Sequence, residues 1–143
     1  MDLSSLITPP SAPWAPAAPS VPESFQAPDI LVAGLMVAGL FVVSFLIGSI
    51  PWGVVVSRLF FGKDIRSEGS GNIGATNAAR TLGKGGAAAV FLLDFGKGLL
   101  TGWLGLQCVQ HLGDARPLLA STAVALAFVG VVWGHIFSPW IGF

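Results

Sequence analysis

No Asp, Glu, Lys or Arg occurs between Ile30 and Ser57, a stretch of 28 residues. A helix needs about 20 predominantly apolar residues to cross the hydrocarbon core of a bilayer. The stretch therefore predicts a first membrane-spanning helix over about 30–57. Pro51 lacks an N–H and its ring clashes with the preceding helical turn, so we expect a kink there, with helix continuing to Phe61. The motif Gly48-Ser49-Ile50-Pro51 fits either a simple proline kink or a bend that opens a polar cavity.

Two further apolar stretches, about 87–106 and 117–134, predict a second and a third span. The chain is 53% hydrophobic and 10% charged, whereas a soluble domain carries about 25% charged residues. Asp94 and Lys97 lie three residues apart in the second stretch, on one helix face. A charge inside hydrocarbon costs about 3 kcal/mol, so we expect an ion pair facing the bundle interior, with Lys97 reaching water or one of the two reaching a ligand as alternatives. These patterns predict an all-α, polytopic integral membrane protein.

The remaining segments differ sharply in composition. Residues 1–28 hold seven of the ten prolines and no Lys or Arg, which predicts a disordered Pro/Ala-rich tail ahead of a membrane domain over 29–143. The polar loop at about 58–86 holds five of the seven basic residues. Because cytoplasmic loops carry an excess of Lys and Arg, we expect this loop in the cytoplasm and the N-terminus outside.

The loop contains a glycine-rich run, Gly69-Ser70-Gly71-Asn72-Ile73-Gly74-Ala75-Thr76-Asn77. Successive free backbone N–H groups in such a bend form an anion-binding nest, and Thr76 or Asn77 is suited to cap a following helix. Arginine binds phosphate through a two-pronged guanidinium. The sequence thus predicts a site for a small phosphorylated molecule, lined by Arg66, Ser70, Gly71, Asn72, Thr76, Asn77 and Arg80.

The expected topology brings the end of the chain to the same membrane face as this loop. That end contributes Ser138 and His135. The imidazole of His135 is suited to bind a hydroxyl or to move a proton. Two plainer interpretations stay open: a glycine-rich loop that only joins helices, and an interfacial His135.

Several classes of site are not predicted. The run lacks the Gly-Lys-Ser/Thr of a P-loop, and no Cys, His, Asp and Glu cluster has metal-ligand spacing. We therefore expect no metal and no cofactor. The net charge is zero, which gives no basic field for nucleic acid.

Five motifs together closely resemble the bacterial acyl-phosphate:glycerol-3-phosphate acyltransferase family (PlsY), in register from about residue 40 to the last residue. They are Gly48-Ser49-Ile50-Pro51-Trp52-Gly53, Asp64-Ile65-Arg66, the glycine-rich run with Arg80, Leu93-Asp94 with Lys97-Gly98, and Gly134-His135-Ile136-Phe137-Ser138-Pro139-Trp140.

The resemblance implies a multi-pass enzyme of the bacterial cell inner membrane. It would transfer an acyl group from acyl phosphate to glycerol 3-phosphate, giving lysophosphatidic acid for phospholipid synthesis. Arg66 and the loop from Ser70 to Arg80 would line the substrate site, His135 is the candidate catalytic residue, and Ser49, Asp94, Lys97 and Ser138 are candidate supporting residues. Acyl phosphate is already activated, so no cofactor is required, and the phosphate itself is a possible proton acceptor.

The resemblance also implies a longer protein. The family continues with a second phosphate-binding run and further membrane helices, so the three predicted helices would be part of a larger bundle. We expect a 143-residue fragment to be inactive by itself. The alternative function is a phosphate-recognising transporter or channel subunit without chemistry. Acyl-chain preference, oligomeric state and the role of the Pro-rich tail stay open.

Overall fold

The computed structural model describes residues 27–112 and 116–142. Within these ranges every regular element is helical. In chain order they are α1 (Ala27–Ser49), α2 (Trp52–Phe61), the short 3₁₀ helix η2 (Ile65–Ser67), α3 (Ala75–Thr81), α4 (Gly83–Leu112), α5 (Pro117–Ile136) and the 3₁₀ helix η3 (Pro139–Ile141). All but the end of the predicted tail over 1–28 lies outside the described residues.

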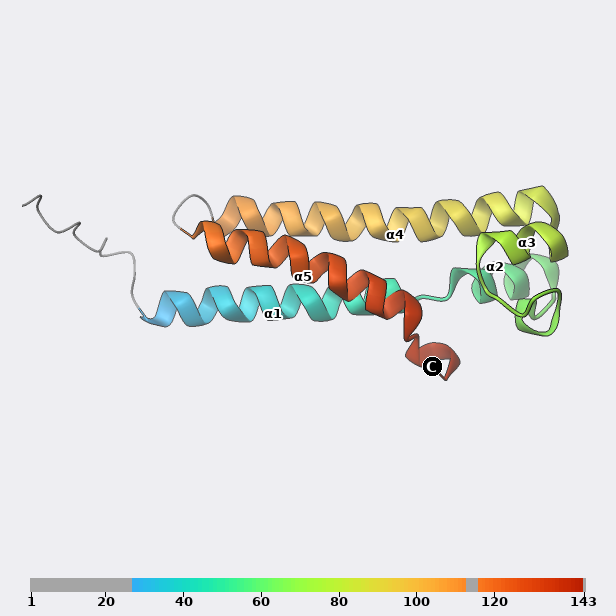
Figure 1. Cartoon of the computed structure of the whole chain (residues 1–143), viewed down its shortest axis with the longest axis horizontal. Helices are drawn as coiled ribbons and strands as arrows, with labels where there is room; N and C mark the ends of the chain where they lie inside the picture. The colour runs from blue at the N-terminus through green and yellow to red at the C-terminus, as the bar shows by residue number, and fades with distance from the viewer. Residues whose placement is uncertain (1–26, 113–115, 143) are drawn as a thin grey trace, which may run out of the picture.

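Three segments are long and apolar enough to cross a membrane: Ile30–Phe61, Gly83–Leu112 and Pro117–Ile141. The prediction of an all-α, multi-pass membrane protein is confirmed. The helices α1, α4 and α5 lie side by side along the length of the molecule, while α2, α3 and the loop between them gather at one end (Figure 1).

The helix α5 packs against both α1 and α4, and its contact with α1 is close because glycines face it. A Cβ added to Gly130 would come within 2.7 Å of the Phe41 carbonyl oxygen, and a Cβ on Gly134 would collide with the Phe45 carbonyl. Small residues permit such backbone approach between membrane helices. This packing sets the position of the end of α5.

The prediction of a kinked but continuous helix through Pro51 is wrong. Residue Ser49 ends α1 and Trp52 begins α2, with Ile50 and Pro51 outside any helix. Proline removes one helical hydrogen bond and crowds the previous turn, and the carbonyls released here bind side chains from elsewhere in the chain. Those contacts stabilise a complete break rather than a bend.

The second span also begins earlier than predicted. The helix α4 starts at Gly83, whose φ of +79° allows an immediate turn out of α3. Gly86 is buried, and a Cβ there would collide with Leu82. Close packing, rather than flexibility, accounts for Gly86.

Two apolar clusters hold the fold. One lies between α1, α4 and α5 and contains Ala33, Val37, Cys108, Leu112, Ala120 and Ala123. The other joins α2, η2, α3 and the start of α4 through Val54, Val56, Ile65, Ala78 and Val90. This second cluster supports the glycine-rich loop.

Candidate functional site

The side chain of Asn77 is the centre of the glycine-rich loop. It is 1% exposed. Its Oδ1 accepts a hydrogen bond from the Ser70 N–H at 2.9 Å, and its Nδ2 donates to the carbonyls of Ile65, Glu68 and Asn72 at 3.2, 3.0 and 2.8 Å. Because all these partners belong to the loop and its approach, Asn77 fixes the loop from within.

Backbone geometry completes the loop. Gly69 and Gly71 have φ of +59° and +72°, a region that favours glycine, and a Cβ on Gly69 would collide with Asn77 Oδ1. The N–H of Gly71 donates to Glu68 O at 3.0 Å and that of Gly74 to Asn72 Oδ1 at 3.0 Å. With the Ser70 N–H also engaged, the predicted nest of successive free N–H groups is wrong at these three positions. The capping prediction is wrong too, because Gly74 precedes α3 without a side-chain cap.

The loop rests directly on the first turn of α2. A Cβ added to Gly53 would collide with the carbonyl oxygen of Ile73. The neighbouring Ile65 is fully buried, and its N–H donates to Ser57 Oγ at 3.4 Å. The glycine that follows the helix break is therefore what allows the loop to lie close to α2.

A cluster of three charged side chains, Arg58, Asp64 and Arg66, precedes the loop in the chain. Arg66 donates to Asp64 through Nε at 3.0 Å and Nη2 at 2.8 Å, and Arg58 Nη2 donates to the same carboxylate at 2.7 Å. These hydrogen bonds, those from Arg66 first, hold the pKa of Asp64 well below its ordinary value. The side chain of Arg66 thus lies beside the loop, already paired with Asp64.

The outward face of the loop carries the remaining predicted residues. Ser70, Asn72, Thr76 and Arg80 are exposed. Thr76 and Arg80 lie four residues apart in α3, on one helix face. Within the described ranges Arg80 makes no ion pair. These side chains are therefore available to an anionic ligand, whereas Asn77 is not.

A second polar cluster lies at the break between α1 and α2. Lys97 Nζ donates to the carbonyl oxygens of Gly48 at 2.9 Å and Ile50 at 3.4 Å. It also lies 2.8 Å from Asp94 Oδ1 and 2.8 Å from His135 Nδ1. The predicted Asp94–Lys97 pair is confirmed, and Lys97 is buried with 6% of its side chain exposed. An ammonium group at this position also complements the negative carboxyl end of α1.

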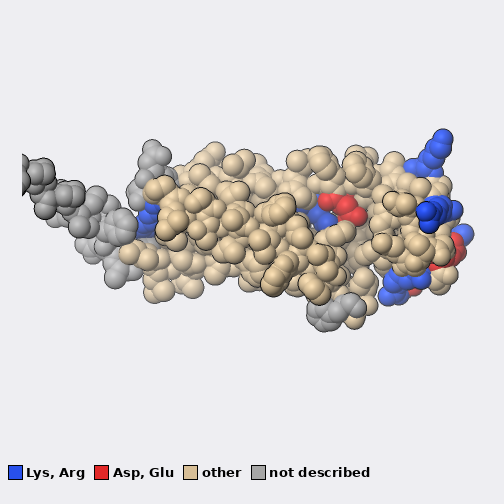
Figure 2. Space-filling model, in the orientation of Figure 1, with Lys and Arg blue, Asp and Glu red and all other residues tan. Residues whose placement is uncertain are grey.

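The end of the chain is attached to the same break. Ser138 Oγ donates to Ser49 O at 2.6 Å, and Trp140 Nε1 donates to Ser49 Oγ at 2.8 Å. The hydroxyl of Ser49 in turn donates to Leu46 O at 2.7 Å. The break thus binds side chains from α4 and from the C-terminal segment, and α5 reaches it only through the contact of His135 with Lys97. Figure 2 shows a small patch of acidic and basic atoms midway along the molecule, where the surrounding surface is uncharged. This patch is separate from the charged end of the molecule that carries the loop.

The structure brings the predicted residues together as two groups. The loop group contains Arg66, Ser70, Gly71, Asn72, Thr76, Asn77 and Arg80, and the break group contains Ser49, Asp94, Lys97, His135 and Ser138. The helix α2 joins them, because Gly53 contacts the loop while Pro51 precedes it. Ile141 packs against the apolar cluster under the loop, but no hydrogen bond or ion pair among the described residues links His135 or Ser138 to the loop. The expected meeting of the two segments is therefore confirmed only through α2 and Ile141.

Some residues that make up these two groups were not predicted as site residues. They are the carbonyls of Gly48 and Ile50, the indole of Trp140, and the pair Arg58 and Asp64. The spacing Asp64-Ile65-Arg66 is a signal that could have identified the carboxylate, since an Asp directly before a 3₁₀ turn is suited to accept a hydrogen bond from the N–H two residues later, as Asp64 does from Arg66. The carbonyl acceptors could not be found from side-chain types.

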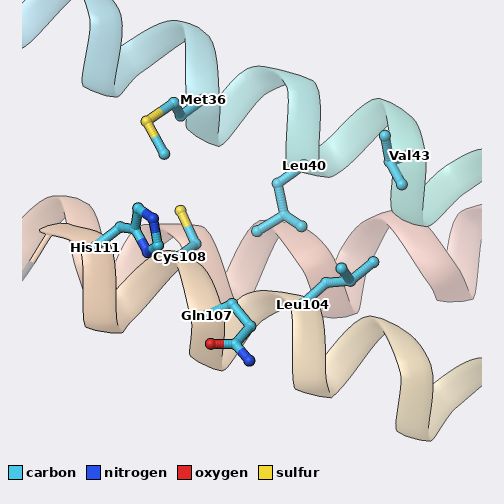
Figure 3. A pocket seen from close by; sticks show the side chains of 7 residues that line it. All are labelled: Met36, Leu40, Val43, Leu104, Gln107, Cys108 and His111. Atoms are coloured by element: carbon cyan, nitrogen blue, oxygen red, sulfur yellow. The ribbon is translucent and has the colours of Figure 1, made fainter.

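Several apolar grooves lie outside these groups, and two of them border residues named above or in Figure 3. One, of about 430 Å³, runs along α2 and is bordered by Arg58 and Trp140. The other, of about 330 Å³, lies between α1 and α4 and is lined by Met36, Leu40, Val43, Leu104, Gln107, Cys108 and His111 (Figure 3). Of these two grooves, the first adjoins the break, through Ile50, Pro51 and Trp140.

Comparison with known proteins gives a consistent result. A family model described as glycerol-3-phosphate acyltransferase matches residues 38–143. Curated glycerol-3-phosphate acyltransferases that resemble the chain include those of Anaeromyxobacter dehalogenans strain 2CP-C, 44% identical over 118 residues, and Gluconobacter oxydans, 45% identical over 121 residues. The alignments cover 82% and 85% of this chain, and 54% and 50% of those relatives. The chain spans about half the length of the curated relatives it matches. No solved structure matches it significantly.

Proposed function

This chain belongs to the glycerol-3-phosphate acyltransferase family, and on that premise we propose that it forms part of an enzyme that acylates glycerol 3-phosphate. The acyl donor is an acyl phosphate, the product is lysophosphatidic acid, and the product enters phospholipid synthesis. The observation that supports this proposal best is the loop held by Asn77, which directs hydroxyl and guanidinium groups outward.

Glycerol 3-phosphate is proposed to bind at the outward face of this loop. Thr76 and Arg80, one turn apart on α3, would hold its phosphate, with Ser70 and Asn72 beside the glycerol hydroxyls. A guanidinium group binds a phosphate through two parallel hydrogen bonds. Asn77 is a positioning residue in this proposal, since its amide is already used by the loop. Arg66 would complete the phosphate site from its pair with Asp64.

Acyl phosphate is proposed to place its chain in the apolar groove along α2. Arg58 borders this groove, so a cation lies where the phosphate of the donor would sit. The glycerol hydroxyl oxygen attacks the acyl carbonyl carbon, the bond from that carbon to the phosphate oxygen breaks, and the released phosphate takes the hydroxyl proton. Positioning two reactants together supplies several kcal/mol of catalysis, and donors aimed at the developing charge supply more.

The break group, at the junction of α1 and α2, is proposed to support this reaction. His135 would contact substrate, while Ser49, Asp94, Lys97 and Ser138 hold the surrounding backbone in place. We further propose that the site faces the cytoplasm at the bacterial inner membrane, with the N-terminus outside, because five of the seven basic residues lie in the loop region and cytoplasmic loops are rich in Lys and Arg.

The test is a chimera in which this chain supplies the aligned segment of the Gluconobacter oxydans relative. Purified chimera is given labelled glycerol 3-phosphate and a long-chain acyl phosphate, and lysophosphatidic acid is measured. We expect product that depends on both substrates and that falls in the Arg80→Ala variant but not in Lys84→Ala, a matched exposed cation.

A chimera that inserts into membranes and binds glycerol 3-phosphate, yet forms no product, would overturn the proposal. Uptake of glycerol 3-phosphate into vesicles without product would favour the transporter alternative. The two relatives named above are acyltransferases, and neither comparison favours transport.

A further inference from the structure

The contact between Lys97 and His135 defines which nitrogen of the imidazole carries a proton. Lys97 Nζ lies 2.8 Å from His135 Nδ1, a distance typical of a hydrogen bond. A neutral imidazole has one donor nitrogen and one acceptor nitrogen, and an imidazolium has no acceptor. The assignment therefore depends on whether Lys97 is the donor.

The surroundings of Lys97 make it the donor. It makes hydrogen bonds with Gly48 O, Ile50 O and His135 Nδ1, and an ammonium group has only N–H donors and no acceptor. The carbonyls can only accept, and the Asp94 carboxylate lies 2.8 Å from the same nitrogen. An ammonium surrounded in this way leaves Nδ1 as the acceptor.

No other group in contact holds a proton on Nδ1. Asp94 Oδ1 is 3.8 Å from it, beyond hydrogen-bond distance. The neighbouring α1 contributes backbone carbonyls at this point, and the C-terminal segment contributes Ser138 and Trp140, which bind Ser49. Asp94 and Lys97 are thus the titratable groups that face His135 within the described chain.

We propose that Lys97 holds His135 as the neutral ring with its proton on Nε2, so that His135 acts on substrate as a hydrogen-bond donor and not as a proton acceptor. This inference rests on the proposed function only for the identity of the substrate. The side chain of His135 is 46% exposed, which leaves Nε2 able to reach a phosphate or hydroxyl oxygen. Lys97 is a positioning residue, because it acts through His135.

The ring state is tested by nitrogen NMR on the full 143-residue chain in micelles. The chain has two histidines, so a His111→Gln background reports His135 alone. We expect Nδ1 to have the shift of an unprotonated ring nitrogen and Nε2 that of a protonated one. In Asp94→Asn with Lys97→Met, which removes both charges together, the Nδ1 shift should move toward its protonated value, while Lys84→Met leaves it unchanged.

A protonated Nδ1 in the parent chain would overturn the proposal. So would an unchanged Nδ1 shift in the double variant, provided that its helix content by circular dichroism matches the parent. This readout needs no substrate, so it stands or fails apart from the proposed acyl transfer.

The donor role is tested in the active chimera. Glutamine carries an N–H donor but is not a base, so His135→Gln should stay within about tenfold of the parent in kcat, whereas His135→Ala should lose about 10²-fold, as for removal of one oriented donor. Equal losses in both variants would overturn the donor role. A chimera inactive before substitution would count against the proposed function and leave the NMR result intact.

Discussion

The hydroxyl of Ser138 donates to the backbone carbonyl of Ser49 at 2.6 Å, although the two residues are 89 positions apart in the chain. This bond attaches the C-terminal segment to the broken end of α1. Trp140 adds a second bond to the same serine through its indole N–H. The attachment therefore depends on the carbonyl and the hydroxyl of Ser49, the residue at which the break before Pro51 ends α1.

We expect Ser138→Ala to loosen the C-terminal segment. A buried acceptor left without its donor costs about 1–3 kcal/mol, so amide exchange at residues 137–142 should accelerate by tenfold or more. Ser121→Ala is the matched control, because Ser121 is exposed and bonds only to carbonyls of its own helix. Equal exchange in both variants would show that the Ser49 bond does not hold the segment.

Asn77→Ala should disorder the glycine-rich loop. The change removes four hydrogen bonds at once and leaves buried backbone groups unpaired, each at about 1–3 kcal/mol. Protease cleavage between residues 69 and 74 reports the opening. Asn72→Ala, which loses a single bond to Gly74, should be cleaved far more slowly, and a reversed order would refute the central position of Asn77.

Gly134→Ala should separate α5 from α1. A Cβ at this position collides with backbone atoms of α1, whereas a Cβ at Gly102 meets nothing within 4 Å. Overpacking of this kind costs about 1–3 kcal/mol, so unfolding in a denaturing detergent should occur earlier for Gly134→Ala. In Gly102→Ala the alanine gains helix propensity, about 1 kcal/mol, and stability should be unchanged or higher.

The hydrogen bonds of the Asp64 carboxylate should stabilise the folded chain in a way that is lost in acid. The pKa of this carboxylate is lowered in the folded chain from an ordinary 3.8, chiefly by hydrogen bonds from Arg66 and Arg58. A lowered pKa stabilises the fold above the unfolded value, and this contribution is lost as the pH falls through the folded pKa. In a carboxyl NMR titration, Arg66→Met should raise the pKa of Asp64, while Arg80→Met should not. An Asp64 pKa at the ordinary value in the parent chain would contradict the hydrogen bonds from Arg66 and Arg58.

In the chimera, Arg80→Ala should raise KM for glycerol 3-phosphate with little change in kcat. Hydrogen bonds to a charged group contribute about 1.5–3 kcal/mol, which corresponds to a rise of roughly 10- to 100-fold. A fall in kcat at unchanged KM would instead indicate a contact made only in the transition state. The control is again Lys84→Ala, which should leave both constants near the parent values.

The sequence predicted the helical membrane fold because the relevant signals are local. Apolar stretches of sufficient length predict membrane-spanning helices without any tertiary information. The three-residue spacing of Asp94 and Lys97 likewise predicted their ion pair. The position of Arg66 near the glycine-rich loop could also be read from the sequence, and the spacing of Asp64 and Arg66 offered a signal for their pairing.

The roles inside the site were less predictable, because they depend on which atoms meet. Asn77 has the residue type of a ligand-binding amide, yet burial turns it toward the loop. The local sequence around Pro51 is compatible with either a kinked helix or a complete break. Only the arrival of Lys97 and Ser138 at its carbonyls distinguishes the two outcomes, and those partners lie far away along the chain.

The lengths of α4 and α5 set the depth of the two polar groups. At 20 residues, α5 matches the thickness of the hydrocarbon core, about 30 Å, so we expect His135 near its end to lie at a water boundary, with Lys97 at the same level. The 30-residue α4 continues past that level to Gly83, a further 20 Å or so at about 1.5 Å per residue. We therefore expect the glycine-rich loop to stand clear of the lipid tails, where a water-soluble molecule would reach it without entering the membrane.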